Sequence, residues 1–186
     1  MDNLYQPPKA ELLDEQSPSR SAFFVTSENK LYLLYFATFG LYAIYWFYKQ
    51  WDSQRSAMLP QKITPAARSF FQVFFTHSLC RRISEHKQRQ GQEPWDYSST
   101  AWLYIGLSLA SNGLARIDLQ NDILDLLLLI GCVMLPAIPL AQIQQQANQA
   151  SGDDSGQGNA RFSAYNLLLV TPGALLWLLV LVGVFL

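Results

Sequence analysis

Five polar or charged side chains stand within or beside long apolar stretches of the sequence: Asn112, Arg116, Asp118, Asp122 and Asp125. An ionisable group at membrane depth is costly, so such residues often relay protons or bind ions. The carboxylates here could do either, with Arg116 as an internal counter-ion. We therefore take Asn112, Arg116, Asp122 and Asp125 as a candidate polar membrane site. The alternative is solvated or locally paired groups at the outer membrane surface, because the acids lie about one turn from predicted helix ends.

A second set of candidate residues is basic and flanks a Phe-rich segment: Arg68, Arg81, Arg82, Lys87 and Arg89. Near a membrane surface these side chains could face lipid and contact anionic headgroups. The same charges would also serve simply to hold their loop in the cytoplasm. The sequence does not decide between these two roles.

The remaining reactive residue types form no recognisable site. His77, His86 and Cys80 leave a zinc site short of ligands, and no third residue orients a His–Cys pair. Cys80 and Cys132 sit in or beside apolar segments and should be small buried hydrophobes. The sequence also lacks a phosphate-binding glycine motif and a nucleic-acid-binding stripe. We therefore expect no cofactor, no metal, no nucleic acid partner and no enzymatic activity.

The composition divides the chain into apolar stretches and polar stretches. Half of its 186 residues are hydrophobic and 15% are charged, against about 25% charged residues in a typical soluble domain. The mean hydropathy is only +0.07, because polar residues are concentrated in a few stretches. This pattern predicts an all-α fold, a polytopic membrane helix bundle.

Four apolar segments are long enough to cross a bilayer as helices: 31–48, 101–117, 123–143 and 165–186. The first has no charge and, at ~1.5 Å per residue, covers ~27 Å of the ~30 Å hydrocarbon core. Its C-terminal tyrosines and tryptophans are typical of a membrane interface. Two prolines within 123–143 should kink that helix.

Other segments are predicted not to cross. Residues 66–80 are short and amphipathic, so we expect an interfacial helix on the membrane surface, with a fifth, short span as the alternative. Residues 1–30 should be a flexible tail before a helical membrane domain over 31–186. Within that domain, residues 144–163 are rich in Gln, Gly and Ser and should be a flexible linker without core-forming residues.

The distribution of basic residues predicts an orientation. Eight of the thirteen Lys and Arg residues lie between the first two predicted spans, and basic loops stay in the cytoplasm. Four spans leave nine basic residues inside and four outside, whereas five spans leave eight and five and move the N-terminus inside. Both arrangements put the C-terminus in the periplasm. The side of the N-terminus stays open.

Three motifs resemble a known family. The segment FVTSENKLYLLYFATFGLYAIYWFYKQW, from Phe24 to Trp51, is followed by an amphipathic P..R..F..FF segment beginning at Pro65 and by an LP..P…Q…N run from Leu135 to Asn148. Together they cover about a third of the chain. In these motifs the chain resembles a family of small, uncharacterised bacterial multi-pass inner-membrane proteins. The resemblance implies a bacterial inner-membrane location and no mechanism.

Two functions are compatible with these observations. The first is a non-enzymatic membrane protein that binds a protein partner or lipid, as a homo-oligomer or as an immunity-type protective protein. Its basic cytoplasmic loop and the small-residue helix face at Gly106, Ala110 and Gly113 favour it. The alternative is a small transporter or channel subunit that uses the candidate polar membrane site. A membrane enzyme would need a cluster of His, Asp or Glu residues, which the sequence does not contain.

Overall fold

The computed structural model describes residues 22–185, and every regular element in that range is helical. The predicted all-α class is confirmed. Residues 1–21 of the predicted flexible tail lie outside the described residues. Residues 22–30 correct the prediction, because Phe23, Thr26 and Lys30 are buried and a helix begins at Glu28. The helices are α1 (Glu28–Ala37), α2 (Tyr42–Ser53), α3 (Pro65–Phe70), α4 (Gln72–Arg89), α5 (Ser98–Leu114), α6 (Asp122–Ala150), the 3₁₀ helix η1 (Gln157–Asn159) and α7 (Ala164–Phe185).

The first predicted span, 31–48, is two helices rather than one. Phe39 and Gly40, between α1 and α2, have positive φ angles of 52° and 83°. A left-handed residue ends a helix, and glycine adopts this conformation at little cost. The Thr38 hydroxyl accepts a hydrogen bond from the backbone N–H of Tyr42 (2.9 Å) and so supports the first turn of α2.

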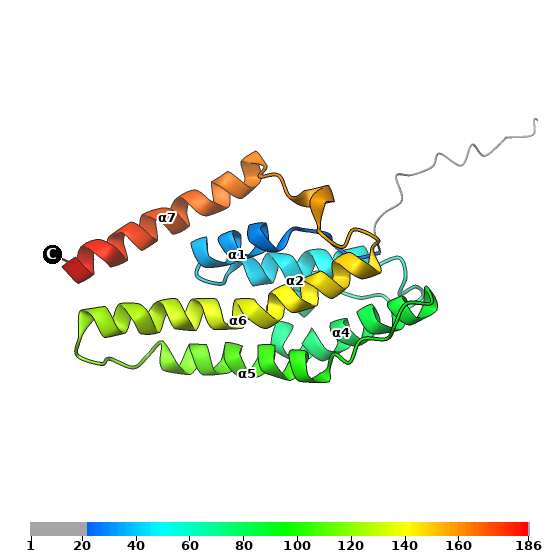
Figure 1. Cartoon of the computed structure of the whole chain (residues 1–186), viewed down its shortest axis with the longest axis horizontal. Helices are drawn as coiled ribbons and strands as arrows, with labels where there is room; N and C mark the ends of the chain where they lie inside the picture. The colour runs from blue at the N-terminus through cyan, green and yellow to red at the C-terminus, as the bar shows by residue number, and fades with distance from the viewer. Residues whose placement is uncertain (1–21, 186) are drawn as a thin grey trace, which may run out of the picture.

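α1 and α2 run in opposite directions and form a hairpin (Figure 1). Phe24, which precedes α1, exchanges two hydrogen bonds with the Gln50 side chain near the end of α2. In one straight helix, residues 26 positions apart would lie ~39 Å from each other. The chain therefore enters and returns at the same end of the molecule, which differs from the single crossing that the sequence predicts.

The amphipathic segment predicted over 66–80 is also divided. α3 begins with Pro65, as expected for a first-turn proline. Phe71 (φ −93°, ψ 36°) then interrupts the helix before α4, which continues well beyond the predicted end. Phe70, Phe71 and Phe74 are exposed, and an interfacial position of this segment stays a prediction.

α6 is the central helix of the bundle. It runs antiparallel to α5 and also contacts α1, α4 and α7 (Figure 1). The Asn121 side chain caps its start by accepting hydrogen bonds from the backbone N–H groups of Ile123 and Leu124, both at 3.1 Å. α6 continues as one helix through Pro136 and Pro139.

The flexible linker predicted over 144–163 is wrong in its first part, because α6 extends to Ala150. Gln144, Ala147 and Asn148 are fully or almost fully buried there. The Gln-rich composition suggested a linker, but the amides of Gln144 and Asn148 lie on a buried helical face and are core residues. Their hydrogen-bond partners, described below, make this burial tolerable.

Two residues of α7 pack closely against the end of α1 and the turn that follows it. Gly173 passes so close to α1 that a Cβ at this position would lie 1.7 Å from the Ala37 carbonyl oxygen. The Trp177 ring stacks on Phe36 and on Phe39, with centroid separations of 4.5 and 4.4 Å. Its Nε1 donates to the Phe36 carbonyl oxygen (2.9 Å), which satisfies a carbonyl at the end of α1.

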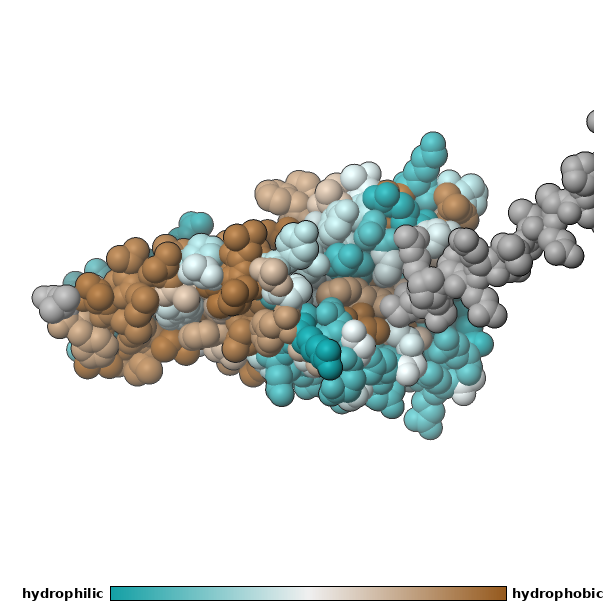
Figure 2. Space-filling view, turned by 90° about the horizontal axis from the view of Figure 1, so that it is seen from above, coloured by the Kyte–Doolittle hydropathy of each residue, from teal (hydrophilic) through white to brown (hydrophobic). Residues whose placement is uncertain are grey.

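One half of the molecule is apolar on its surface and the other half is polar (Figure 2). Among the described helices, α6 and α7 are long and apolar enough to cross a membrane. Only 11% of the apolar stretch of α7 is buried, so α7 is not the core helix of a soluble domain. The structure thus provides two candidate spans and does not confirm four, because 31–48 is divided and α5 has 17 residues.

Candidate functional site

Buried amide side chains hold the extended segment 23–27 against α2 and α6. Asn148 donates from Nδ2 to the Thr26 carbonyl (3.0 Å) and accepts from the Thr26 N–H (3.3 Å). Gln50 bonds in the same two-way manner to the backbone of Phe24. An extended segment normally satisfies its backbone in a sheet. Here two amides replace the missing strand.

Gln144 joins the two halves of this network. Its Oε1 accepts hydrogen bonds from the indole Nε1 of Trp46 and from Gln50 Nε2. Its Nε2 donates to the Phe24 carbonyl (3.1 Å) and to Asn148 Oδ1. The side chain is fully buried, so the network fixes the relative positions of α2, α6 and the extended segment.

The loop between α6 and α7 is tied to the start of α1. Lys30 donates from Nζ to Asn159 Oδ1 (2.7 Å) and to the Arg161 carbonyl (2.8 Å). Asn159 Nδ2 in turn donates to the Val25 carbonyl (3.0 Å). The start of α1 and the α6–α7 loop therefore lie together at the polar end of the molecule.

The structure brings two of the four residues of the candidate polar membrane site together. Arg116 and Asp125 line an open hollow of about 360 Å³ at the α5–α6 turn, and Asp118 lines it as well. Asp125 Oδ1 accepts a hydrogen bond from the backbone N–H of Leu119 (3.0 Å). Asp125 therefore stabilises the turn that precedes its own helix.

The other two residues of that candidate site lie apart from the hollow. Asn112 Nδ2 donates to the Ser108 carbonyl one turn earlier in α5 (2.8 Å), and Asp122 is exposed in the first turn of α6. Within residues 22–185 no carboxylate forms an ion pair with Arg116. A role in proton or ion transfer stays a prediction.

The predicted basic cluster does not form one lipid-facing surface, and Lys87 shows why. Its side chain is only 8% exposed, because α4 packs against α6. Lys87 Nζ donates to the amide oxygens of Gln146 (2.6 Å) and Gln149 (2.9 Å). Lys87 is therefore a buried contact between two helices, which corrects its predicted lipid-facing position.

Arg68 also turns toward the protein. Its guanidinium lies over the rings of Trp51 and Phe75, 4.4 and 5.0 Å from their centroids, a cation–π arrangement. Burial, followed by the charge of Arg82, lowers the pKa of Arg68. Arg68 thus contributes to the packing of α3 against α2 and α4.

Three of the basic residues stay at the surface of α4. Arg81 and Arg89 each lie 3.7 Å from a carboxylate oxygen of Glu85, in exposed pairs that contribute little to stability. Arg82 lines a small hollow of about 290 Å³ beside them. His86 also lines this hollow, and burial, then the charge of Arg89, lowers the pKa of His86.

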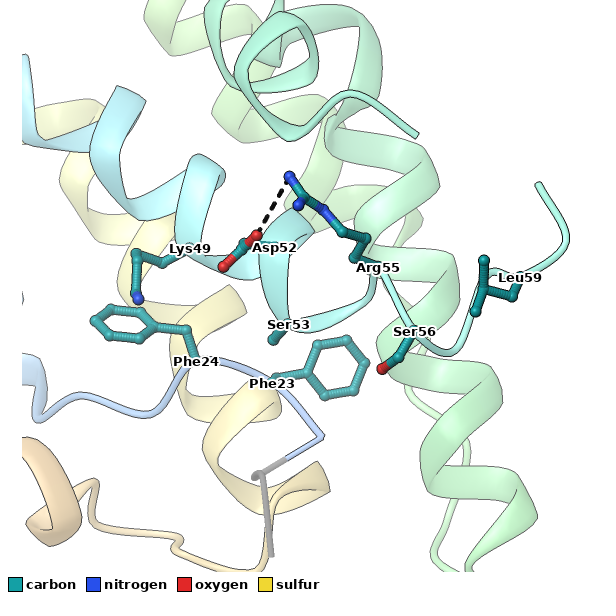
Figure 3. Close-up of a pocket in the computed structure, with 8 residues that line it drawn as sticks. All are labelled: Phe23, Phe24, Lys49, Asp52, Ser53, Arg55, Ser56 and Leu59. Carbon is teal, nitrogen blue, oxygen red and sulfur yellow. Dashed lines mark ion pairs between the residues drawn. The ribbon is translucent and has the colours of Figure 1, made fainter. Parts of the chain in front are cut away.

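A hollow of about 630 Å³ adjoins the small one on the polar half (Figure 3), and we call it the α2 groove. It lies between segment 23–24 and the C-terminal part of α2 with the turn that follows. Its lining residues are Phe23, Phe24, Lys49, Asp52, Ser53, Arg55, Ser56 and Leu59. Ser53 and Ser56 line both hollows, which makes them one continuous surface.

The α2 groove has positive charge that the described residues leave unneutralised. Lys49 forms no ion pair within residues 22–185, and its Nζ lies 5.8 Å from the Phe24 ring centroid. Arg55 and Asp52 are 3.6 Å apart but largely exposed, so water screens their attraction. In the adjoining hollow, Arg82 Nε is buried and has no hydrogen-bond partner in the described part of the chain. The surface can therefore accept an anion.

Neither the amide network nor the groove was predicted from the sequence. Trp46 and Gln50, like Gln144 and Asn148, are four positions apart, which places each pair on one helix face. That spacing was a usable signal for the network. Lys49 was counted only among the basic residues that predict the membrane orientation. Nothing in the sequence shows that residues 23–24 lie beside it.

No family model, no curated protein and no solved structure matches this chain. In the part that the structure describes, no three His, Cys, Asp or Glu side chains converge to hold a metal ion. The case for function therefore rests on the geometry of the groove and on the apolar half of the molecule.

Proposed function

We propose that the protein is a bacterial inner-membrane protein that works without catalysis, by binding a protein partner or lipid at its cytoplasmic face. The observation that carries this proposal is the α2 groove, a charged hollow in the polar half of a molecule whose other half is apolar. The almost wholly uncovered apolar surface of α7 supports the membrane location. An immunity-type protective role would be one form of such binding.

In this proposal the chain crosses the bilayer three times, through α5, α6 and α7. α5 lies antiparallel to α6 and ends at the turn where α6 begins (Figure 1). Its 17 residues cover ~26 Å. Trp102, Leu103 and Leu109 on α5 are exposed, as lipid-facing side chains would be. The α1–α2 hairpin enters the apolar half and returns, as re-entrant segments supported by neighbouring helices do.

The charges favour a cytoplasmic polar half. Thirteen basic residues, less Lys9 and Arg20 outside the described range, leave eleven, and only Arg116 belongs to the α5–α6 turn. For the same eleven residues the four-span arrangement gives nine inside and two outside, so the ten-to-one division is steeper. α7 ends at the same end of the molecule as that turn (Figure 1), so the C-terminal end would be periplasmic and the chain at residue 22 cytoplasmic.

Site-specific photo-crosslinking in native membranes tests the binding role. A photo-reactive residue at Ser56, which is exposed and lines both hollows, should yield a defined protein or lipid adduct. The same residue at Gln120, exposed in the α5–α6 turn, is the matched control and should not yield that adduct. Recovery of uncrosslinked protein alone from the Ser56 position would contradict the proposal.

The alternative function, a small transporter or channel subunit, has one observation in its favour. Arg116 and Asp125 share a hollow at the α5–α6 turn. Purified protein in vesicles should then conduct an ion or proton, and Asp122→Asn with Asp125→Asn should abolish the flux. Absent flux, or flux unchanged in the double variant, would reject this alternative.

A further inference from the structure

We infer that the α2 groove binds the phosphate headgroup of an anionic phospholipid, whose acyl chains lie along the exposed apolar face of α2. The inference rests on the proposed membrane location and names the ligand of the same groove. It is carried by the continuity of a charged hollow with an uncovered apolar track on one helix.

The apolar track consists of Leu41, Tyr45 and Tyr48, at positions i, i+4 and i+7. This spacing places the three side chains on one face of α2. They are 67%, 43% and 36% exposed, so the described part of the chain leaves this face uncovered. Over seven residues the track extends ~10 Å along the helix, toward the tip of the hairpin. A phospholipid acyl chain can cover such a strip.

The track leads directly into the groove. Lys49 follows Tyr48 in α2, and Asp52 lies one turn beyond it on the same face. Phe24, a wall of the groove, contacts Tyr45 of the track edge to face, with ring centroids 6.2 Å apart. Tyrosine rings with an apolar body and a polar tip favour the headgroup level of a membrane. The groove therefore lies where a lipid phosphate would be.

The charge of the surface favours an anionic headgroup over a zwitterionic one. The groove and the adjoining hollow are lined by four basic side chains and two carboxylates. Both carboxylates already contact arginines, whereas Lys49 and the Nε of Arg82 have no anionic partner in the described part of the chain. Guanidinium groups bind phosphate through paired hydrogen bonds, and Ser56 can add a hydroxyl donor.

Native mass spectrometry of the purified full chain in detergent tests the inference, with a short-chain phosphatidylglycerol as the probe. The wild-type protein should bind it saturably and bind the matching phosphatidylcholine at least tenfold more weakly. Lys49→Gln with Arg55→Gln should weaken phosphatidylglycerol binding about thirtyfold, as expected for two basic groups at a headgroup. The control, Lys62→Gln with Arg161→Gln, removes the same charge at two exposed residues that line neither hollow and should stay within twofold of wild type.

Two further measurements separate a lipid from a free anion. Leu41→Ser with Tyr45→Ser should weaken phosphatidylglycerol binding, and inorganic phosphate should not displace the lipid. The inference is overturned if the groove and control variants bind equally, if phosphatidylcholine binds as tightly, or if phosphate competes and the track variant binds as wild type. A protein adduct at Ser56 without phosphatidylglycerol binding would refute the lipid ligand and leave the proposed binding role standing.

Discussion

Replacement of Gln144 by leucine tests whether the buried amide network fixes the fold. Gln144 is 0% exposed, and leucine fills a similar volume without a polar atom. The Trp46 indole Nε1 would lose the only hydrogen-bond partner that the described structure gives it. The other groups keep partners, because the Phe24 carbonyl and the Gln50 amide still bond to each other, and Asn148 still bonds to Thr26.

The size of the effect follows from the one group that loses its partner, the Trp46 indole N–H. One buried donor left unpaired costs about 1–3 kcal/mol, and loss of the bonds that couple α2 to α6 adds to this. We therefore expect Gln144→Leu to lower the free energy of unfolding by about 2–4 kcal/mol. Gln145→Leu, the same change at an exposed neighbour in α6, should stay within about 0.5 kcal/mol of wild type.

Denaturing-detergent unfolding followed by circular dichroism measures both variants under the same conditions. Coincident unfolding curves for Gln144→Leu and Gln145→Leu would refute the reasoning, since the network would then contribute nothing that an exposed glutamine does not.

Three further predictions concern contacts outside this network. Trp177→Ala removes two ring stacks and the hydrogen bond to Phe36, with an expected stability loss of about 3–5 kcal/mol. Limited proteolysis in detergent should therefore release α7 faster than in the wild-type protein, and equal cleavage rates would contradict this. Gly156→Ala should destabilise the protein by more than about 1 kcal/mol, the cost of a strained residue, because Gly156 has φ +66° and a Cβ would lie 2.3 Å from the Thr26 carbonyl oxygen. A thermal midpoint equal to that of the wild-type protein would show that the α6–α7 loop does not pack against Thr26. Burial raises the pKa of the Cys80 thiol to about 12, so a maleimide should label Cys80 at neutral pH only after unfolding; rapid labelling of folded protein would place this thiol outside the core.

Periodicity and composition were sufficient for the helical class and for the location of most helices. The apolar runs that became α5 and α7 were located within three residues of their ends, and the start of α6 within one, whereas the end of α6 was placed seven residues too early. The division of 31–48 was missed because its apolar composition is continuous, and only the glycine at position 40 marks the turn. Whether one glycine ends a helix depends on tertiary contacts, here the docking of Trp177 against Phe36 and Phe39.

The candidate sites show a similar limit. Charge counting located the basic residues but could not show which way they point. Lys87 turns inward because α6 offers it two amides, and Lys49 lines a groove because residues 23–24 return to α2. Both contacts join segments distant in sequence, which local patterns do not report. Arg116 and Asp118 lie at the α5–α6 turn, where Asp125 accepts a backbone hydrogen bond, and their position relative to a membrane surface stays a prediction.

Cysteine accessibility tests the central claim, a re-entrant hairpin with three crossings, most directly. Single cysteines would replace Asn29, Lys62 and Gln120, all exposed, in a background without native cysteines, and intact cells would be treated with a membrane-impermeant maleimide. Three crossings with a re-entrant hairpin should give labelling at 120 in intact cells and labelling at 29 and 62 only after the membrane is opened. Labelling at 29 from outside, with 62 protected, would mean that residues 31–48 cross the membrane and would contradict the account.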